Sequence, residues 1–196
     1  MMSKQTPSQT VGPFFAYGLT ARQYAYPDHQ IADGVLVGDE TPGSRIRILG
    51  HVFDGAGAPI PDALVEIWQA DAAGRYPGVS GPGRGNVDFS GFGRQGTGAD
   101  PECRFTFLTV KPGKVDERQA PHITFIVFMR GLLTHVYTRL YFDDEAAANA
   151  VDPVLAAVPA ARRHTLIALR DSLAADALYR FDIRMQGKDE TVFFDV

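Results

Sequence analysis

The sequence predicts a mainly β protein: a two-sheet β-sandwich of mixed strands, with an extended N-terminal arm and one or two short helices. Short runs rich in β-branched and aromatic residues recur along most of the chain, separated by turn residues. Many short strands with frequent turn signals are typical of sandwiches and related β folds. The predicted strands cover residues 45–53, 63–69, 103–109, 122–129, 135–142, 178–185 and 191–196.

Two of these runs have clear local signals. The residues Asp54-Gly55-Ala56-Gly57 favour a turn, so we expect the strands at 45–53 and 63–69 to form a hairpin. Residues 103–109 alternate between polar and apolar side chains, and a turn at Lys111-Pro112-Gly113 follows them. A strand with one buried face is expected there.

The N-terminal part of the chain differs in composition from the rest. The first forty-odd residues are rich in proline, glycine and tyrosine and have neither helical nor strand periodicity. We therefore expect residues 1–44 to form an arm that packs on a partner and on the domain, and residues 45–196 to form one β-sandwich domain. A chain of 196 residues is long enough for a single domain with a sizeable core.

One segment favours helix and another favours loop. Between residues 153 and 175, Leu166, Leu169 and Leu173 recur at helical spacing after a start signal at Asp152-Pro153, which predicts one or two short surface helices. Residues 78–98 are glycine-rich and contain Gly-Phe-Gly-Arg-Gln-Gly at 91–96. This motif binds dinucleotides only between a strand and a helix, and no helix follows it, so we interpret the segment as a loop near a pocket or interface.

Composition and charge exclude several classes of function. The net charge is −4 and the basic residues are dispersed, which argues against a nucleic-acid partner. No apolar run approaches the length of a membrane span, and the first residues lack the apolar stretch of a secretory signal. The lone Cys103 cannot form an internal disulfide. A cytoplasmic protein without membrane contact is expected.

Two residues could contribute to a metal site. Phenolate and imidazole together suit an oxidised metal such as ferric iron, and Tyr76 and His122 could supply one of each. On its own, however, His122 is better explained as a hydrogen-bonded structural residue, and Tyr76 as a packing residue. Nucleophilic catalysis has little support, because no Gly-x-Ser-x-Gly motif is present and Cys103 lies within a predicted strand.

Six stretches of the sequence carry a resemblance to a known protein family. They lie in order through nearly the whole chain, at residues 6–15, 65–76, 110–113, 121–125, 139–142 and 179–183. They include Gly74-Arg75-Tyr76 and Pro121-His122-Ile123-Thr124-Phe125. Together they resemble the intradiol ring-cleaving dioxygenases, and within that family the alpha-type subunits that do not hold iron.

The resemblance implies a vestigial metal site. Catalytic members of the family hold ferric iron with two tyrosines and two histidines, and their positions carry over to Tyr76, Val115, His122 and Thr124. Valine has no donor atom, and threonine is a poor substitute for a neutral imidazole. Because affinity for ferric iron depends on the number of ligands and on phenolate charge, we expect this chain to bind no metal. Ferric iron would be held by the partner.

The resemblance also implies what the chain contributes instead. It would pair with a homologous, iron-bearing beta subunit, assemble further as alpha-beta pairs, and help cleave 3,4-dihydroxybenzoate, a small aromatic substrate, to beta-carboxymuconate. The family places the alpha arm and one arginine at the substrate pocket. These roles carry over to Thr10, Gly12, Pro13, Phe14 and Arg130, with no catalytic residue in this chain alone. A fixed guanidinium at Arg130 would attract an anionic substrate.

Two other functions remain open from the sequence. The chain could be a self-sufficient ferric dioxygenase whose ligands include His135, Tyr137 or Tyr141, or it could be a non-enzymatic β-sandwich scaffold. Stoichiometric iron and a phenolate-to-iron absorption band in the purified chain would favour the first. A neighbouring gene that encodes a homologous chain with a His-x-His pair would count against the scaffold.

Overall fold

The computed structural model describes residues 7–27, 30–78, 88–174 and 177–196, and this part of the chain folds mainly into strands. The strands are β1 Arg45–Phe53, β2 Leu64–Gln69, β3 Phe92–Gly96, β4 Arg104–Val110, β5 His122–Phe128, β6 Val136–Phe142, β7 Ile167–Arg170, β8 Leu178–Arg180 and β9 Ile183–Arg184. The helices are α1 Phe15–Leu19, η1 Ala21–Tyr24, η2 Asp143–Glu145, α2 Ala146–Asn149, α3 Pro153–Ala157 and η3 Ala160–Leu166.

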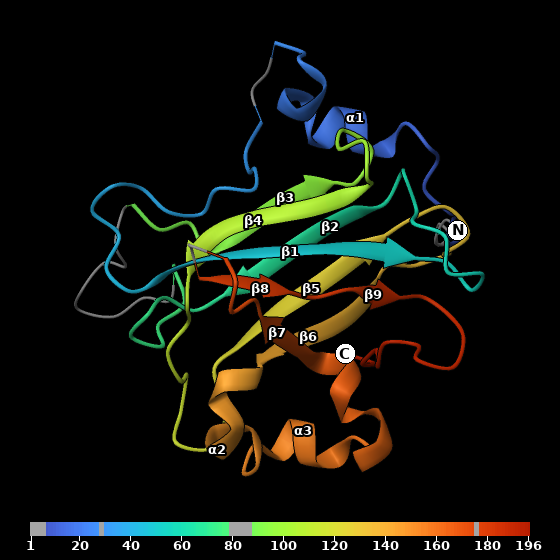
Figure 1. Cartoon of the computed structure of the whole chain (residues 1–196). Helices are drawn as coiled ribbons and strands as arrows, with labels where there is room; N and C mark the ends of the chain where they lie inside the picture. The colour runs from blue at the N-terminus through green and yellow to red at the C-terminus, as the bar shows by residue number, and fades with distance from the viewer. Residues whose placement is uncertain (1–6, 28–29, 79–87, 175–176) are drawn as a thin grey trace, which may run out of the picture.

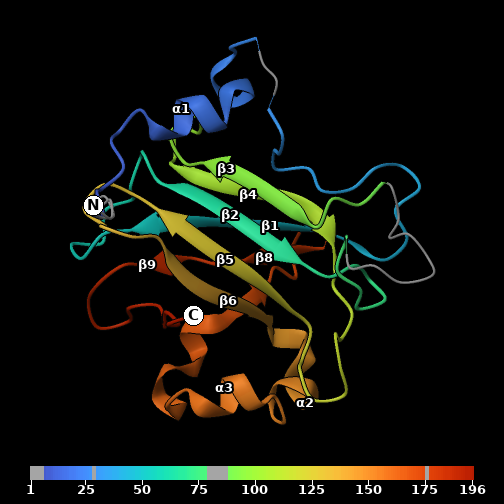
Figure 2. The ribbon, with the colours of Figure 1, turned by 180° about the vertical axis from the view of Figure 1, so that it is seen from behind.

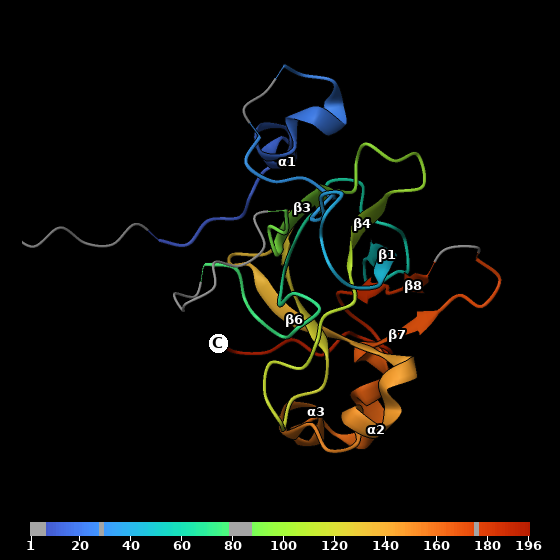
Figure 3. The ribbon, with the colours of Figure 1, turned by 90° about the vertical axis from the view of Figure 1, so that its left-hand side faces the viewer.

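The strands form one hydrogen-bonded series that folds over on itself. Their order is β3-β2-β5-β6-β7-β8-β1-β4, with β9 beside β1. Strand β7 joins the two layers, because it pairs parallel to β6 and antiparallel to β8. The ends of the series, β3 and β4, lie close together (Figures 1 and 3). This arrangement confirms the predicted mainly β fold of mixed strands, with its two layers joined along one side.

The core lies between the two layers and follows from alternation along the strands. In β1, exposed or half-buried positions alternate with buried ones, as the sequence pattern predicts. The ring of Phe125 on β5 packs against Phe105 and Phe107 on β4, with centroids 5.9 and 6.2 Å away. It also packs against Phe181, between β8 and β9, at 5.2 Å. Phe125 therefore joins the two halves of the core.

The predicted hairpin between residues 45–53 and 63–69 is wrong. Strand β1 pairs with β4, β8 and β9, whereas β2 pairs with β3 and β5 in the other layer. The turn at 54–57 does form, because the carboxylate of Asp54 accepts hydrogen bonds from the amides of Ala56 and Ala58. The chain after this turn crosses between the layers, and sequence signals for a turn do not distinguish a crossing from a hairpin.

The structure also corrects three local predictions. Helix α3 begins after Asp152 as predicted, but the leucine stripe is not helical, because Leu169 lies in β7 and Leu173 is 95% exposed in a turn. Part of the expected loop, Phe92–Gly96, is strand β3, while residues 79–87 of that loop lie outside the described residues. Residues 191–196 form no regular strand and contribute only an isolated bridge between Phe194 and Tyr137.

The N-terminal arm is only partly extended. It forms α1 and η1, which Figures 1 and 2 show at one end of the sheet, near β3. The side chain of Gln23 hydrogen-bonds to Gln95 and to the backbone of Gly96 on β3. Further along, the amide of Leu36 donates to the carbonyl of Leu108 on β4, and Leu36 is buried in the core. Residues 30–41 thus pack into the domain.

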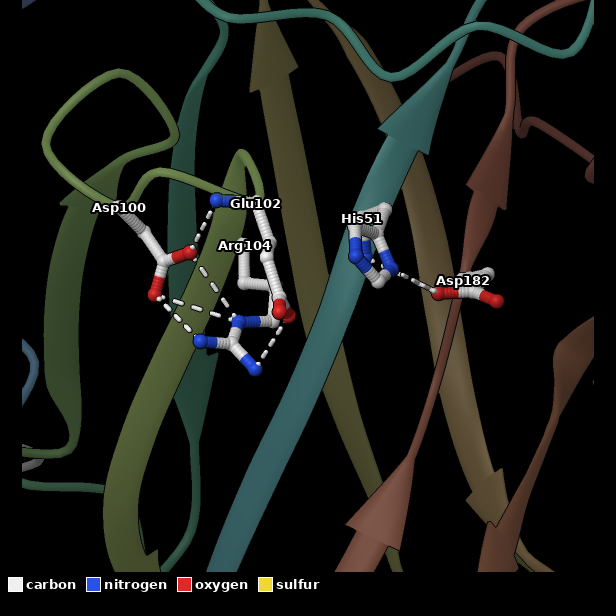
Figure 4. A network of polar contacts seen from close by, with 5 residues as sticks. All are labelled: His51, Asp100, Glu102, Arg104 and Asp182. Carbon is white, nitrogen blue, oxygen red and sulfur yellow. Dashed lines mark hydrogen bonds and ion pairs between the residues drawn. The ribbon is translucent and has the colours of Figure 1, made fainter.

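Polar contacts lie on both sides of His51 on β1 (Figure 4), and those with Asp182 link β1 to the residues after β8. Figure 4 shows His51 on β1, between Arg104 of β4 and Asp182, which follows β8. The carboxylate of Asp182 accepts a hydrogen bond from the His51 amide and lies 3.0 Å from Nδ1 of its ring. Arg104 pairs with Asp100 at 3.0 Å and Glu102 at 2.7 Å.

None of the helices in the described ranges is long and apolar enough to cross a membrane.

Asp152 connects α3 to the sheet, and its replacement gives a first testable prediction. Its buried carboxylate accepts hydrogen bonds from the amides of Val154 and Leu155 through Oδ1, and from the amide of Ala120 through Oδ2. We expect Asp152→Asn to lower the free energy of unfolding by about 1–3 kcal/mol, because an amide group cannot accept on both sides. Urea unfolding measures this, with the exposed Asp189→Asn as control; equal effects would contradict it.

Candidate functional site

The loops that follow β2 and β4 touch each other closely. Gly74 has a φ of +78°, and a Cβ there would lie 1.9 Å from the carbonyl oxygen of Lys114, so only glycine fits. The amide of Gly113 donates to the carbonyl of Asp71 at 2.9 Å. These contacts bring the loop that carries Tyr76 next to the loop that carries Val115.

Strand β5 contributes the other two predicted ligand positions. His122 and Thr124 lie two residues apart on one face of the strand. Thr124 pairs across the sheet with Trp68 on β2, and the ring of Tyr76 stacks on Trp68 with centroids 5.7 Å apart and an interplanar angle of 11°. The structure therefore brings Tyr76, Val115, His122 and Thr124 to one region from three separate segments.

His122 is held as a neutral, buried imidazole. It is 4% exposed, and burial lowers its pKa, although the carbonyl of Ala120 opposes part of that shift. Its Nδ1 lies 2.8 Å from that carbonyl oxygen. Because a carbonyl can only accept, Nδ1 carries the proton and Nε2 presents a lone pair. This is the form of histidine that could bind a metal.

The other side chains of this region favour neither a deprotonated tyrosine nor a bound metal cation. Burial raises the pKa of Tyr76, against a smaller lowering effect of Arg139, so its hydroxyl stays protonated at neutral pH. Burial likewise raises the pKa of Tyr141 to about 12. Arg139, on β6 directly opposite Thr124, places a guanidinium among these groups, and its charge also lowers the pKa of His122.

Ferric iron does not fit this set of residues. Val115 offers no donor atom and Thr124 offers only a hydroxyl. Tyr76 and His122 alone therefore match the expected ligand types. The positive charge of Arg139 opposes a trivalent cation at short range. Within the described ranges, no group of three or more histidine, cysteine, aspartate or glutamate side chains could hold a metal ion.

The predicted pocket residues of the arm meet a turn at the other end of β5. The hydroxyl of Thr10 accepts a hydrogen bond from the amide of Gly131, the residue after Arg130, at 2.9 Å. Gly12, Pro13 and Phe14 are exposed, and Phe14 is 78% accessible. A cavity of about 150 Å³ lies between the arm and the turn. It is lined by Gln9, Val11, Phe15, Phe128, Met129, Leu132, Leu133, Thr134 and His135.

Arg130 has a partner that sequence reasoning missed. Its side chain is 57% exposed, and its Nε forms an ion pair with Oδ2 of Asp62, whose side chain is only 13% exposed. The other carboxylate oxygen of Asp62 is buried and has no hydrogen-bond partner in the part of the chain that the structure describes. Asp62 therefore engages Nε of Arg130, while more than half of the arginine side chain stays exposed.

The two regions are well separated along one strand. Thr124 and Arg130 are six residues apart on β5 and the turn that follows it, which corresponds to about 20 Å of extended chain. Arg130 and the arm thus cannot serve the region around Tyr76 and His122 of the same chain.

The residues proposed for a self-sufficient metal site do not converge. Nε2 of His135 lies 2.9 Å from the hydroxyl of Tyr137. Tyr141 lies four residues further along β6, about 13 Å away. It is buried, and its hydroxyl donates to Asp152 at 3.3 Å. A metal bound to His135 and Tyr137 would therefore be out of reach of Tyr141.

Gln119 and Arg139 are further residues that sequence reasoning missed. Nη1 of Arg139 donates to Oε1 of Gln119 at 3.1 Å, and Nε2 of Gln119 donates to the carboxylate of Asp116 at 2.9 Å. A signal for Arg139 was present, because it lies two residues before Tyr141 in a predicted strand and so shares its face. No signal in the sequence pointed to Gln119.

The fold and the arrangement of these loops are those of the intradiol ring-cleaving dioxygenase class. A family model described as "Dioxygenase" matches residues 21–187. The chain belongs to this family.

Individual relatives agree with this assignment. The chain is 53% identical over 194 residues to a protein from Burkholderia cepacia named "Protocatechuate 3,4-dioxygenase alpha chain", with 98% of each chain covered. It is 36% identical over 176 residues to the beta chain of that name from the same organism, covering 84% of this chain and 74% of the relative. A solved intradiol ring-cleavage dioxygenase from Tetranychus urticae has the same fold, with a TM-score of 0.63 at 21% identity, covering 81% and 88% of the two chains.

Proposed function

We propose that this chain is the alpha subunit of a protocatechuate 3,4-dioxygenase. It pairs with a homologous beta subunit that holds ferric iron, and it completes that subunit's active site for intradiol cleavage of 3,4-dihydroxybenzoate to beta-carboxymuconate. The observation that carries the proposal is the similarity to a named alpha chain over 98% of both sequences. The poor fit of this chain's own residues to iron supports it.

The division of labour between the subunits follows from the two regions of the chain. The region around Tyr76 and His122 has Val115 and Thr124 at its other two ligand positions. The arm and the 130–131 turn, in contrast, present exposed groups at the opposite end of β5. Thr10, Gly12, Pro13, Phe14 and Arg130 form the part of the substrate pocket that this subunit supplies. Residues before α1 reach the partner, while residues 30–41 belong structurally to the domain formed by residues 45–196.

Charge gives Arg130 its part in the reaction. The substrate carries a carboxylate, and a guanidinium that is always protonated attracts it and holds it in one orientation. Ferric iron held by the partner would supply the chemistry that cleaves the bond between the two hydroxyl-bearing ring carbons and adds both atoms of dioxygen to the product. The pairs assemble further into a larger oligomer that acts in the cytoplasm, without nucleic acid or membrane.

Co-expression with the homologous beta chain tests the proposal. We expect oxygen uptake with 3,4-dihydroxybenzoate only when both chains are present, with iron recovered in proportion to the beta chain. The isolated alpha chain should bind no iron and have no activity. Iron bound stoichiometrically to the isolated chain, and lost in Tyr76→Phe, would contradict the proposal.

The arm gives a second prediction. Deleting residues 1–15 is expected to weaken pairing and turnover together, because it removes Thr10 from the 130–131 turn and Phe15 from Phe128, whose rings lie 5.7 Å apart. Analytical ultracentrifugation and oxygen uptake measure the two effects. A matched control is the deletion of residues 1–6 alone, which keeps both contacts. A variant without residues 1–15 that still pairs and turns over normally would contradict the assignment of the arm.

A further inference from the structure

The half-buried guanidinium of Arg139 lies where several segments of the vestigial site converge. Arg139 stands on β6 opposite Thr124, and its neighbour on the same face of β6, Tyr141, stands opposite His122. Residues opposite one another in a sheet project from the same face. Arg139 and Tyr141 therefore project from the face of the sheet that carries Thr124 and His122.

Hydrogen bonds fix this guanidinium in place from the loop side. Nη1 of Arg139 donates to Oε1 of Gln119. Gln119 is itself held by Asp116, which accepts from its amide nitrogen at 2.7 Å and from its side chain at 2.9 Å. Asp116 directly follows Val115, the position that lacks a ligand. The loop after β4 is therefore tied to Arg139 through one neutral amide.

A second chain of contacts runs from the same region toward α3. The hydroxyl of Tyr141 donates to Asp152, which also accepts the amide of Ala120 just before β5. Arg139 is thus flanked by Asp116 on one side, through Gln119, and by Asp152 on the other, through Tyr141. The carboxylates of Asp116 and Asp152 therefore compensate the charge of Arg139, each through one intervening side chain.

We infer that Arg139 takes the place of a metal ion in this site: its guanidinium ties the loop at 115–120 to strand β6, and it excludes a cation even when the missing ligands are restored. A bound metal joins segments that are distant in sequence by accepting electron pairs from them. A guanidinium joins them by donating hydrogen bonds in a fixed plane, and it cannot lose its charge at physiological pH. The two cations cannot occupy the same space. This inference concerns the chain's own site and does not depend on its pairing with a beta subunit.

Restoring the ligands tests the exclusion. We compare Val115→Tyr/Thr124→His with the same double variant carrying Arg139→Met, which keeps the length of the side chain but removes its charge and donors. Ferric citrate is titrated into each full-length chain, with iron per chain after gel filtration and the phenolate-to-iron absorption band as readouts. The triple variant should bind ferric iron at least about tenfold more tightly than the double variant, the scale on which groups around a metal act.

The matched control is the double variant with Arg170→Met, which removes a 55% exposed arginine from β7 and should behave like the double variant. Equal iron affinity of the double and triple variants would overturn the inference. So would a triple variant that binds no iron although circular dichroism shows it to be folded.

A second measurement tests the cross-link without any metal. In the otherwise unchanged chain, Arg139→Met should speed hydrogen exchange at the backbone amides of Arg118, Gln119 and Ala120 by at least about tenfold relative to Arg170→Met, because the loop loses its tie to β6. Unchanged exchange at these amides would overturn the inference, and this holds even if the triple variant fails to fold.

Discussion

Phe125→Ala is expected to lower the free energy of unfolding by about 3–5 kcal/mol, the range for deleting a fully buried aromatic ring. Phe125 is 0% exposed, and from β5 in one layer it touches rings of the opposite layer. Alanine would leave a cavity walled by Phe105 and Phe107 on β4 and by Phe181 near β8. These residues come from two separate segments of the chain, so the surrounding backbone can close the cavity only in part.

The measurement is urea unfolding at a fixed protein concentration, since any pairing adds to the apparent stability. Phe14→Ala is the control, because Phe14 is 78% exposed, and we expect it to change the free energy of unfolding of the isolated chain by less than about 0.5 kcal/mol. A loss below about 1 kcal/mol for Phe125→Ala would mean that the two layers do not share one core.

The contrast between β1 and β3 explains how far the sequence predicts this fold. In β1, nine residues alternate in burial and one face meets the core, so local pattern and tertiary structure agree. Strand β3 consists of Phe92–Gly96 and contains two glycines, which weaken any strand signal. Gly93 is required there because a Cβ would meet Leu36 at 2.6 Å and Phe107 at 3.1 Å. That need arises only once the two layers are packed.

The same reasoning applies to β7 and to the pairing of β1. Leu166 and Leu169 have helical spacing, yet residues 167–170 pair with both β6 and β8, and these sheet contacts override the local preference. Nothing in the turn at 54–57 distinguishes a hairpin from a crossing between layers. Prediction from local signals therefore succeeds for individual strands and fails for their partners.

The candidate site was predictable where a family motif assigns a residue and unpredictable where a partner comes from elsewhere in the chain. Motifs identified Tyr76, His122 and Arg130. Asp62 and Gln119 lie on loops with no motif of their own, and only the folded chain brings Asp62 to Arg130 and Gln119 to Arg139. A charged residue whose partner lies far away in the sequence cannot be recognised from the spacing of residues in a motif.

Arg130→Ala is expected to lower kcat/KM for 3,4-dihydroxybenzoate in the complex with the beta chain. The expected loss of transition-state stabilisation is about 1–3 kcal/mol, comparable with the loss of a charged hydrogen bond. The side chain is 57% exposed although its Nε is engaged by Asp62, so it remains accessible to the substrate carboxylate. Iron content and assembly should stay unchanged, because no metal-ligand position is altered.

The chemistry of the substrate makes this prediction specific. Catechol lacks the carboxylate, so its kcat/KM should fall less in Arg130→Ala. Raising the salt concentration should reduce the difference between wild type and variant, since screening weakens the attraction of an anion to a partly exposed charge. Oxygen uptake with both substrates at low and high salt measures these effects, with Arg170→Ala as a control for the loss of an exposed arginine.

Asp62→Asn separates a role in substrate binding from a role in structure. If the ion pair merely stabilises the turn after β5, removing either partner should loosen the complex and affect both substrates alike. If Arg130 binds the substrate, Asp62→Asn should preserve the preference for the carboxylated substrate, because the positive charge is still present. Arg130→Ala should reduce that preference. Equal losses for the two substrates in Arg130→Ala, measured on an intact complex, would remove Arg130 from the substrate pocket and leave Asp62 and Arg130 as a structural pair.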